Sequence, residues 1–141
     1  PINLGPIPKT IRKTFTGSRS GKGTVDLGTF TVPSAYIEGS IIGVEGWVQI
    51  NRSNDCYAYA QIVVKVNGVT VKTFQADSSD PSVTSKKVDF KDSIPIKGND
   101  VISVTLVGYP VLSQYDISSC SGNIVFFGED VLPSVCVHPT W

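Results

Sequence analysis

Two runs of alternating apolar and polar residues flank the dipeptide Asn67-Gly68, and this pattern constrains the fold more than any other feature of the sequence. Residues 56–66 (CYAYAQIVVKV) alternate before it, and residues 69–74 (VTVKTF) follow it. A period of two is that of a half-buried β-strand, because successive side chains point to opposite faces. Asn-Gly fits a two-residue hairpin turn, in which both turn positions need positive φ. The sequence therefore predicts an antiparallel hairpin here.

Short strands separated by turn residues are predicted from residue 26 onward. They comprise residues 27–33, 41–50, 56–66, 69–74, 83–90, 94–96, 101–107 and 123–127. Pro95 places residues 94–96 at a sheet edge, because proline donates no ladder hydrogen bond, and residues 111–121 are predicted to be a long loop. No segment of ten or more residues has a helical period.

These strands predict an all-β fold, a two-sheet antiparallel β-sandwich. We favour a jelly roll over an immunoglobulin-like fold, because two cysteines flanking a core tryptophan are missing: Trp47 precedes Cys56, and the next cysteine is Cys120.

Residues 1–24 differ from the rest of the chain, with three prolines, four glycines and scattered apolar residues among cations. A segment of this composition buries little surface by itself. We therefore expect an extended basic arm over residues 1–24, lying on another surface, and a sandwich domain over residues 25–141. The predicted contact residues of the arm are Ile2, Leu4, Ile7, Lys9, Ile11, Arg12, Lys13, Phe15, Arg19 and Lys22.

Charge is distributed unevenly along a chain whose net charge is zero. The first 25 residues hold five cations and no acid, whereas residues 98–141 hold four acids and no lysine or arginine. This asymmetry predicts head-to-tail attraction between copies; the alternative is that the cations only solvate a leader segment. Specific nucleic-acid binding is not expected, because the cations are sparse and only Phe15 could stack on bases. No run approaches the ~20 apolar residues of a membrane span.

The sequence offers little from which to build a catalytic site. The single histidine, His138, lies near the C-terminus, where it would share a strand face with Cys136. A frayed terminus is a poor platform for catalysis. Asp77 and Asp80 could offer oxygen ligands to calcium, but they lack the glycine and acid count of a dedicated loop. We expect no enzymatic activity, no metal and no cofactor.

Cysteines and aromatic residues supply two further hypotheses. Cys120 and Cys136 could form a disulfide that leaves Cys56 unpaired, or all three could be buried thiols. The aromatic residues Trp47, Tyr57 and Tyr59 form a candidate platform for stacking on a glycan, and cross-strand packing or a subunit interface is the competing interpretation.

Three stretches carry a resemblance to known proteins: TFTVPSAY (29–36), VVKVNGVTVKTF (63–74) and IPIKGNDVISVTL (94–106). With their KVNG hairpin and their Gly-Asn-Asp turn before a hydrophobic strand, they resemble the β-sandwich (jelly-roll-like) domains of bacteriophage and virus decoration, head-fibre and tail proteins. They are also similar to secreted carbohydrate-binding modules.

The viral resemblance implies a non-enzymatic structural subunit of a virion. Such a capsid decoration or accessory protein would bind copies of itself or a major capsid or tail protein. One alternative is a subunit of an extracellular filament joined by donated strands. The other is a secreted or cell-surface carbohydrate-binding or adhesion module that contacts surface glycans.

Overall fold

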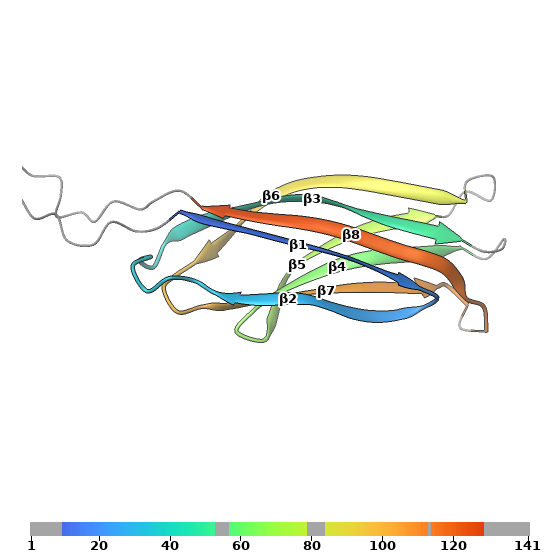
Figure 1. Cartoon of the computed structure of the whole chain (residues 1–141), viewed down its shortest axis with the longest axis horizontal. Helices are drawn as coiled ribbons and strands as arrows, with labels where there is room; N and C mark the ends of the chain where they lie inside the picture. The colour runs from blue at the N-terminus through green and yellow to red at the C-terminus, as the bar shows by residue number, and fades with distance from the viewer. Residues whose placement is uncertain (1–9, 53–56, 79–83, 113, 129–141) are drawn as a thin grey trace, which may run out of the picture.

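The computed structural model describes residues 10–52, 57–78, 84–112 and 114–128, and these form two four-stranded antiparallel sheets packed face to face (Figure 1). The strands are β1 (Ile11–Ser20), β2 (Gly23–Thr31), β3 (Ser40–Arg52), β4 (Ala58–Val66), β5 (Val69–Ser78), β6 (Ser85–Ile96), β7 (Val101–Pro110) and β8 (Ile117–Gly128). One sheet has the order β1-β8-β3-β6 and the other β2-β7-β4-β5. The predicted all-β, two-sheet antiparallel sandwich is confirmed.

The predicted hairpin joins β4 to β5, with Val66 paired to Val69. Asn67 and Gly68 have φ values of 52° and 83°, as a primed two-residue turn requires. Hydrogen bonds to a second turn, at Asp100 and Val101, hold this hairpin turn in place. Asn67 Nδ2 donates to Asp100 Oδ1 at 3.0 Å, and the Val101 N–H donates to Asn67 Oδ1 at 2.9 Å. Two turns from different parts of the chain thus fix each other at one end of the sandwich.

Inward-facing side chains of both sheets form the core, and in β4 these are the alternating residues predicted from the sequence. Large rings fill one end, where Phe30 and Phe126 lie 5.1 Å apart between centroids. Small residues line the other end: a Cβ at Gly122 would lie only 2.7 Å from Ile62 Cδ1. At Gly122, side chains of the opposite sheet therefore fill the space that a Cβ would need.

The predicted arm boundary at residue 24 is wrong, because all ten residues of β1 pair with β8, from Ile11 opposite Gly128 to Ser20 opposite Ser119. Ile11 is buried, and the Phe15 ring lies 6.0 Å from that of Phe30. The polar residues between them suit an edge strand, whose outer positions face water. Residues 1–9 of the predicted arm lie outside the described residues.

Two further boundaries differ from the prediction. Residues 94–96 are not a separate strand but the last three residues of β6. Because β6 is an edge strand, Pro95 does lie on a sheet edge, as predicted. β8 begins at Ile117, within the predicted loop, because Ile117 and Cys120 are buried and burial alternates along the strand from Cys120 onward.

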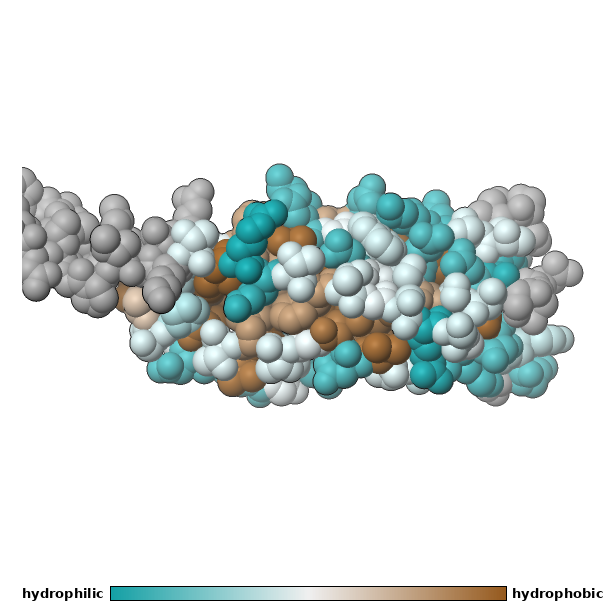
Figure 2. Space-filling model, viewed as in Figure 1, coloured by the Kyte–Doolittle hydropathy of each residue, from teal (hydrophilic) through white to brown (hydrophobic). Residues whose placement is uncertain are grey.

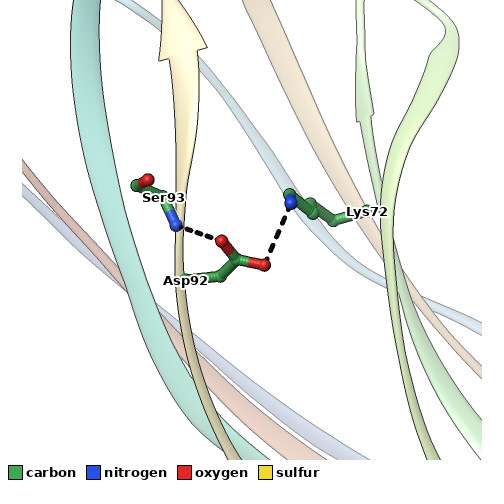
Figure 3. Close-up of polar contacts among 3 residues, drawn as sticks. All are labelled: Lys72, Asp92 and Ser93. Carbon is green, nitrogen blue, oxygen red and sulfur yellow. Dashed lines mark hydrogen bonds and ion pairs between the residues drawn. The ribbon is translucent and has the colours of Figure 1, made fainter.

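The edge strands of the two sheets contact each other along both sides of the sandwich, β5 with β6 and β1 with β2. Along β5 and β6, the Phe74 and Phe90 rings stack at 3.9 Å, and Lys72 Nζ lies 3.0 Å from Asp92 Oδ2 (Figure 3). The Ser93 N–H also donates to Asp92, and together these contacts lower the pKa of that carboxyl. Along β1 and β2, Phe15, Val25 and Leu27 pack against the core, and Figure 2 shows hydrophobic residues along the middle of this side.

Truncation separates the two parts of the predicted arm. We expect deletion of residues 1–24 to unfold the protein, because it removes β1 together with Ile11 and Phe15, and loss of one such core side chain costs about 2–5 kcal/mol. Deletion of residues 1–9 leaves every described pairing intact and should keep the melting temperature near that of the full chain. Thermal unfolding followed by circular dichroism checks both. A cooperative, full-length-like transition after deletion of residues 1–24 would contradict the role of β1.

Candidate functional site

A hollow of about 510 Å³ opens on the outer face of the β1-β8-β3-β6 sheet. Its lining residues are Glu45, Gly46, Trp47, Asp89, Phe90, Lys91 and Val125. The register of β3 and β6 sets Glu45 opposite Lys91 and Trp47 opposite Asp89. Apolar side chains thus meet two carboxylates and one ammonium group in one hollow.

Neighbouring side chains shape the hollow. Lys87 Nζ lies 4.7 Å from the centroid of the Trp47 ring, a cation–π contact. Phe127 lies over Gly43, where a Cβ would come within 2.6 Å of the ring Cζ. The side-chain oxygen of Asn123, which is opposite Trp47 in register, is buried without a hydrogen-bond partner. The outer face is therefore well packed on both sides of the hollow.

The same face has a polar half and an apolar half. Toward the end of β3, Asn51 Nδ2 donates to Ser119 Oγ at 2.8 Å, and Gln49 Nε2 donates to Ser85 Oγ at 3.0 Å. Toward the start of β3, Ile41 is 62% exposed. Polar groups of the first half satisfy one another, so the apolar half with its hollow is the better candidate for an interface.

The predicted aromatic platform is not one surface. Trp47 projects from β3 on the outer face of one sheet, whereas Tyr59 projects from β4 on the outer face of the other, so the sandwich separates them. Tyr57 precedes β4 on the side of Tyr59 and is 44% exposed. Sequence reasoning missed Tyr109, whose ring lies 6.3 Å from that of Tyr59 on the neighbouring strand. Continuing the alternation of β7 past residue 107 would have found it.

Amide side chains lie beside this tyrosine pair. Gln61 Nε2 donates to Gln75 Oε1 at 2.6 Å, and Gln75 Nε2 donates to Asp77 Oδ2 at 2.9 Å. The chain of hydrogen bonds crosses from β4 to β5 next to the tyrosines. This second surface combines aromatic rings with fixed polar groups.

The arm cations that lie in β1 and its turn fall at both ends of the sandwich. Arg12 and Lys13 are exposed at the start of β1, and Arg19 and Lys22 lie at its end. There the Lys22 N–H donates to Asp116 Oδ1 at 2.7 Å, and Lys22 Nζ donates to the Tyr115 carbonyl at 3.1 Å. Part of the attraction between basic head and acidic tail is therefore satisfied within one chain.

Asp116 is held by backbone donors as well as by charge. The N–H of Ile117 and the N–H of Lys22 both donate to its Oδ1, and the charges of Lys22 and Arg19 add to their effect. Because each of these interactions favours the ionised form, the pKa of Asp116 lies below its usual value.

A second hollow, of about 230 Å³, lies where β1 begins and β2 ends. Its lining residues are Thr10, Ile11, Arg12, Lys13, Phe30, Thr31 and Pro33. It combines an apolar floor with a rim of two cations, the opposite sign to the carboxylates beside Trp47.

Few of the residues considered for chemistry lie within the described ranges. Cys120 is a buried free thiol whose pKa is raised by burial, and Cys56, Cys136 and His138 lie outside the described residues. Asp77 is described, but Asp80 is not. Within the described ranges there is no group of three or more histidine, cysteine or acidic residues placed to hold a metal ion, and no helix long and apolar enough to span a membrane.

Comparison with known proteins adds evidence on the fold. No family model and no curated protein matches the sequence. Among solved structures, that of infectious bursal disease virus, Gx strain, has a TM-score of 0.53 and 18% identity, covering 92% of this chain and 36% of that one. The VP2 subviral particle of the same virus has a TM-score of 0.51 and 18% identity, covering 92% and 37%. Its T13 particle has a TM-score of 0.53 and 15% identity, covering 91% and 35%.

These similarities concern the sandwich alone. The chain spans about a third of the length of each matched protein, at identities that show a shared fold and nothing finer. The predicted resemblance to β-sandwich proteins of virus particles is confirmed at this level.

The lowered pKa of Asp116 leads to a test of the turn between β1 and β2. A carboxyl whose pKa is lower in the folded state stabilises the fold above its unfolded pKa, and this contribution disappears as pH falls through the folded pKa. We expect Asp116→Ala to lower the melting temperature at pH 7 and to have a smaller effect as pH falls toward 2. Glu38→Ala, at an exposed carboxylate away from this turn, is the control. An Asp116→Ala shift of equal size at both pH values would contradict the argument.

Proposed function

We propose that this chain is a non-enzymatic structural subunit of a virion and that its sandwich is a jelly roll. The observation that carries the proposal is the strand order β1-β8-β3-β6 facing β2-β7-β4-β5. Most consecutive strands lie in opposite sheets, and only β4 and β5 form a direct hairpin within one sheet. Two interleaved Greek keys produce this order, whereas an immunoglobulin sandwich pairs several consecutive strands directly. The fold similarity to virus-particle structures supports the same interpretation.

Within this role we propose a capsid decoration or accessory protein that binds its neighbours through residues 1–9. This segment carries Ile2, Leu4 and Ile7 together with Lys9 and has no acidic residue. Apolar side chains on a short segment gain free energy by burial against a partner. The partners would be copies of this chain or a major capsid or tail protein, and the location would be the virion.

The β6 edge favours such docking over a filament of strands donated to it. β6 is an edge strand that carries Lys86, Lys87 and Lys91 in addition to Pro95. Charged residues and proline on an edge oppose the addition of a further strand. An arm that lies on a sheet face or in a hollow avoids this obstacle.

A carbohydrate-binding role is the second candidate, and the pair of Tyr59 and Tyr109 beside the Gln61–Gln75–Asp77 hydrogen bonds favours it. Aromatic rings offer faces for the C–H groups of a sugar, and amides and carboxylates bind hydroxyl groups. The surface for this role would be the β2-β7-β4-β5 face, without Trp47.

Assembly is tested by measuring solution mass against concentration. We expect the full chain to form oligomers or to bind capsid particles in sedimentation velocity and electron microscopy, and the chain lacking residues 1–9 to remain a folded monomer. The melting temperature of the truncated chain is the control for folding. A full chain that stays monomeric and binds no particle at any concentration would rule out the structural role.

A glycan array tests the second candidate. If the tyrosine surface binds sugars, Tyr59→Ala and Tyr109→Ala should each weaken binding roughly tenfold, the equivalent of about 1.4 kcal/mol. Trp47→Ala, on the opposite face, is the matched control and should bind normally. Absence of binding by the unmodified chain, or equal loss in all three variants, would eliminate this surface as a sugar site.

A further inference from the structure

The hollow at the start of β1 has cations and no acid in its lining. Its cations are Arg12 and Lys13, and neither forms an ion pair with another described residue. The hollow beside Trp47 has both signs, since Lys91 lies with its two carboxylates and Lys87 lies on the tryptophan ring. Of these two hollows, the first is therefore the one that attracts an acidic peptide.

A third hollow, of about 280 Å³, lies at the same end of the sandwich, where β3 begins and β6 ends. Its charged lining residues are Glu38, Lys97 and Asp100, a net charge of −1 from two anions and one cation. An acidic peptide that reaches this end of the sandwich is therefore repelled by one hollow and attracted by the other.

The segment of residues 129–141, which follows β8, matches the hollow at β1 in charge and apolarity. It carries Glu129 and Asp130 and no lysine or arginine, whereas residues 1–9 carry Lys9 and no acid. Aliphatic residues follow the two acids: Val131, Leu132, Val135 and Val137. Such side chains gain free energy by burial, and the apolar part of the hollow consists of Ile11, Phe30 and Pro33.

The register of β1 and β8 brings this segment to the hollow. Gly128, the last residue of β8, is opposite Ile11. A Cβ placed on Gly128 would lie only 3.7 Å from Ile11 Cβ. Residue 129 therefore follows directly beside a lining residue of the hollow. This proximity selects the same hollow as the charges do, and it is independent of them.

We propose that residues 129–132 fold back over the start of β1 and dock in this hollow of their own chain. The two acids lie against Arg12 and Lys13, and Leu132 enters the apolar part beside Phe30. This contact lies within one chain and does not depend on the proposed assembly through residues 1–9.

The segment is long enough, and the hollow large enough, for this contact. Four extended residues span about 13 Å, whereas packed sheets lie about 10 Å apart, so Leu132 can pass from β8 to the β2 side of the hollow. A cavity of about 150 Å³ holds a benzene-sized group. The hollow of about 230 Å³ therefore has room for a leucine side chain.

Docking within one chain is favoured over docking on a second copy. The covalent tether at Gly128 gives the segment an effective concentration on the order of millimolar at its own hollow. A second copy would have to reach a similar concentration in solution to compete. The charge asymmetry of the chain then acts within the chain at both ends of β1, since Lys22 already lies with Asp116 at the other end.

Paramagnetic broadening in NMR spectra of the full chain tests this contact. A nitroxide is attached to Cys136, four residues beyond Leu132, in a chain with Cys56→Ser, and the thiol of Cys120 is buried. We expect strong broadening of the amide signals of residues 30–31, which line the hollow at β1. The amide signals of residues 66–67, which line the acidic hollow at the same end, should stay sharp.

Charge reversal distinguishes docking from mere proximity of the segment. Arg12→Glu with Lys13→Glu should lower the ratio of docked to free segment about tenfold and remove the broadening at residues 30–31. Glu129→Lys with Asp130→Lys, which leaves β1 unchanged, should have the same effect. The chain with all four substitutions should recover the broadening. Lys86→Glu with Lys87→Glu, an equal change of charge on exposed positions of β6, is the matched control and should keep it.

Three results would overturn the proposal. One is broadening that survives both reversals, and another is its failure to return in the chain with all four substitutions. The third is broadening in an isotope-labelled chain without nitroxide when it is mixed with a nitroxide-bearing chain without isotope label, since this would place the segment on a second copy. None of these results bears on assembly through residues 1–9, which the truncation above tests separately.

Discussion

The hydrogen-bonded pairing of β1 with β8 joins the beginning and the end of the described chain, and the rest of the molecule depends on it. It places β8 between β1 and β3, so that the last strand to be reached along the chain completes the centre of its sheet. It also brings Phe15 against Phe30 and Phe126, which fill one end of the core. Because Ile11 is opposite Gly128, the chain enters and leaves the sandwich side by side. The described part of the chain therefore begins and ends at the same end of the sandwich.

Much of the sandwich follows from local patterns in the sequence. Asn67-Gly68 specifies its own turn, since few other dipeptides accept positive φ at both positions. The alternation in β4 and β7 identifies which side chains are buried, because a shift of one residue would turn the whole apolar set to solvent. Edge strands carry a weaker signal. In β1 only Ile11 and Phe15 mark the inner face over the first five residues, and polar neighbours made the segment resemble an arm.

The candidate surfaces could be predicted only in part, because alternation says which face of a strand is outward but not which sheet the strand joins. Trp47 and Tyr59 are both outward, and the sequence offers no local sign that β3 and β4 lie in opposite sheets. The partner of Tyr59, Tyr109, is separated from it by 50 positions and is set beside it by the register of β4 and β7. The hollow beside Trp47 likewise joins β3, β6 and β8. Such constellations depend on long-range pairing.

Assembly through a nine-residue segment, as proposed above, would rest on a weak individual contact. Stable pairs of proteins bury about 800 Å² on each partner, more than so short a segment covers. Weakness of this kind suits a particle, since many identical contacts act together and their combined affinity far exceeds that of one.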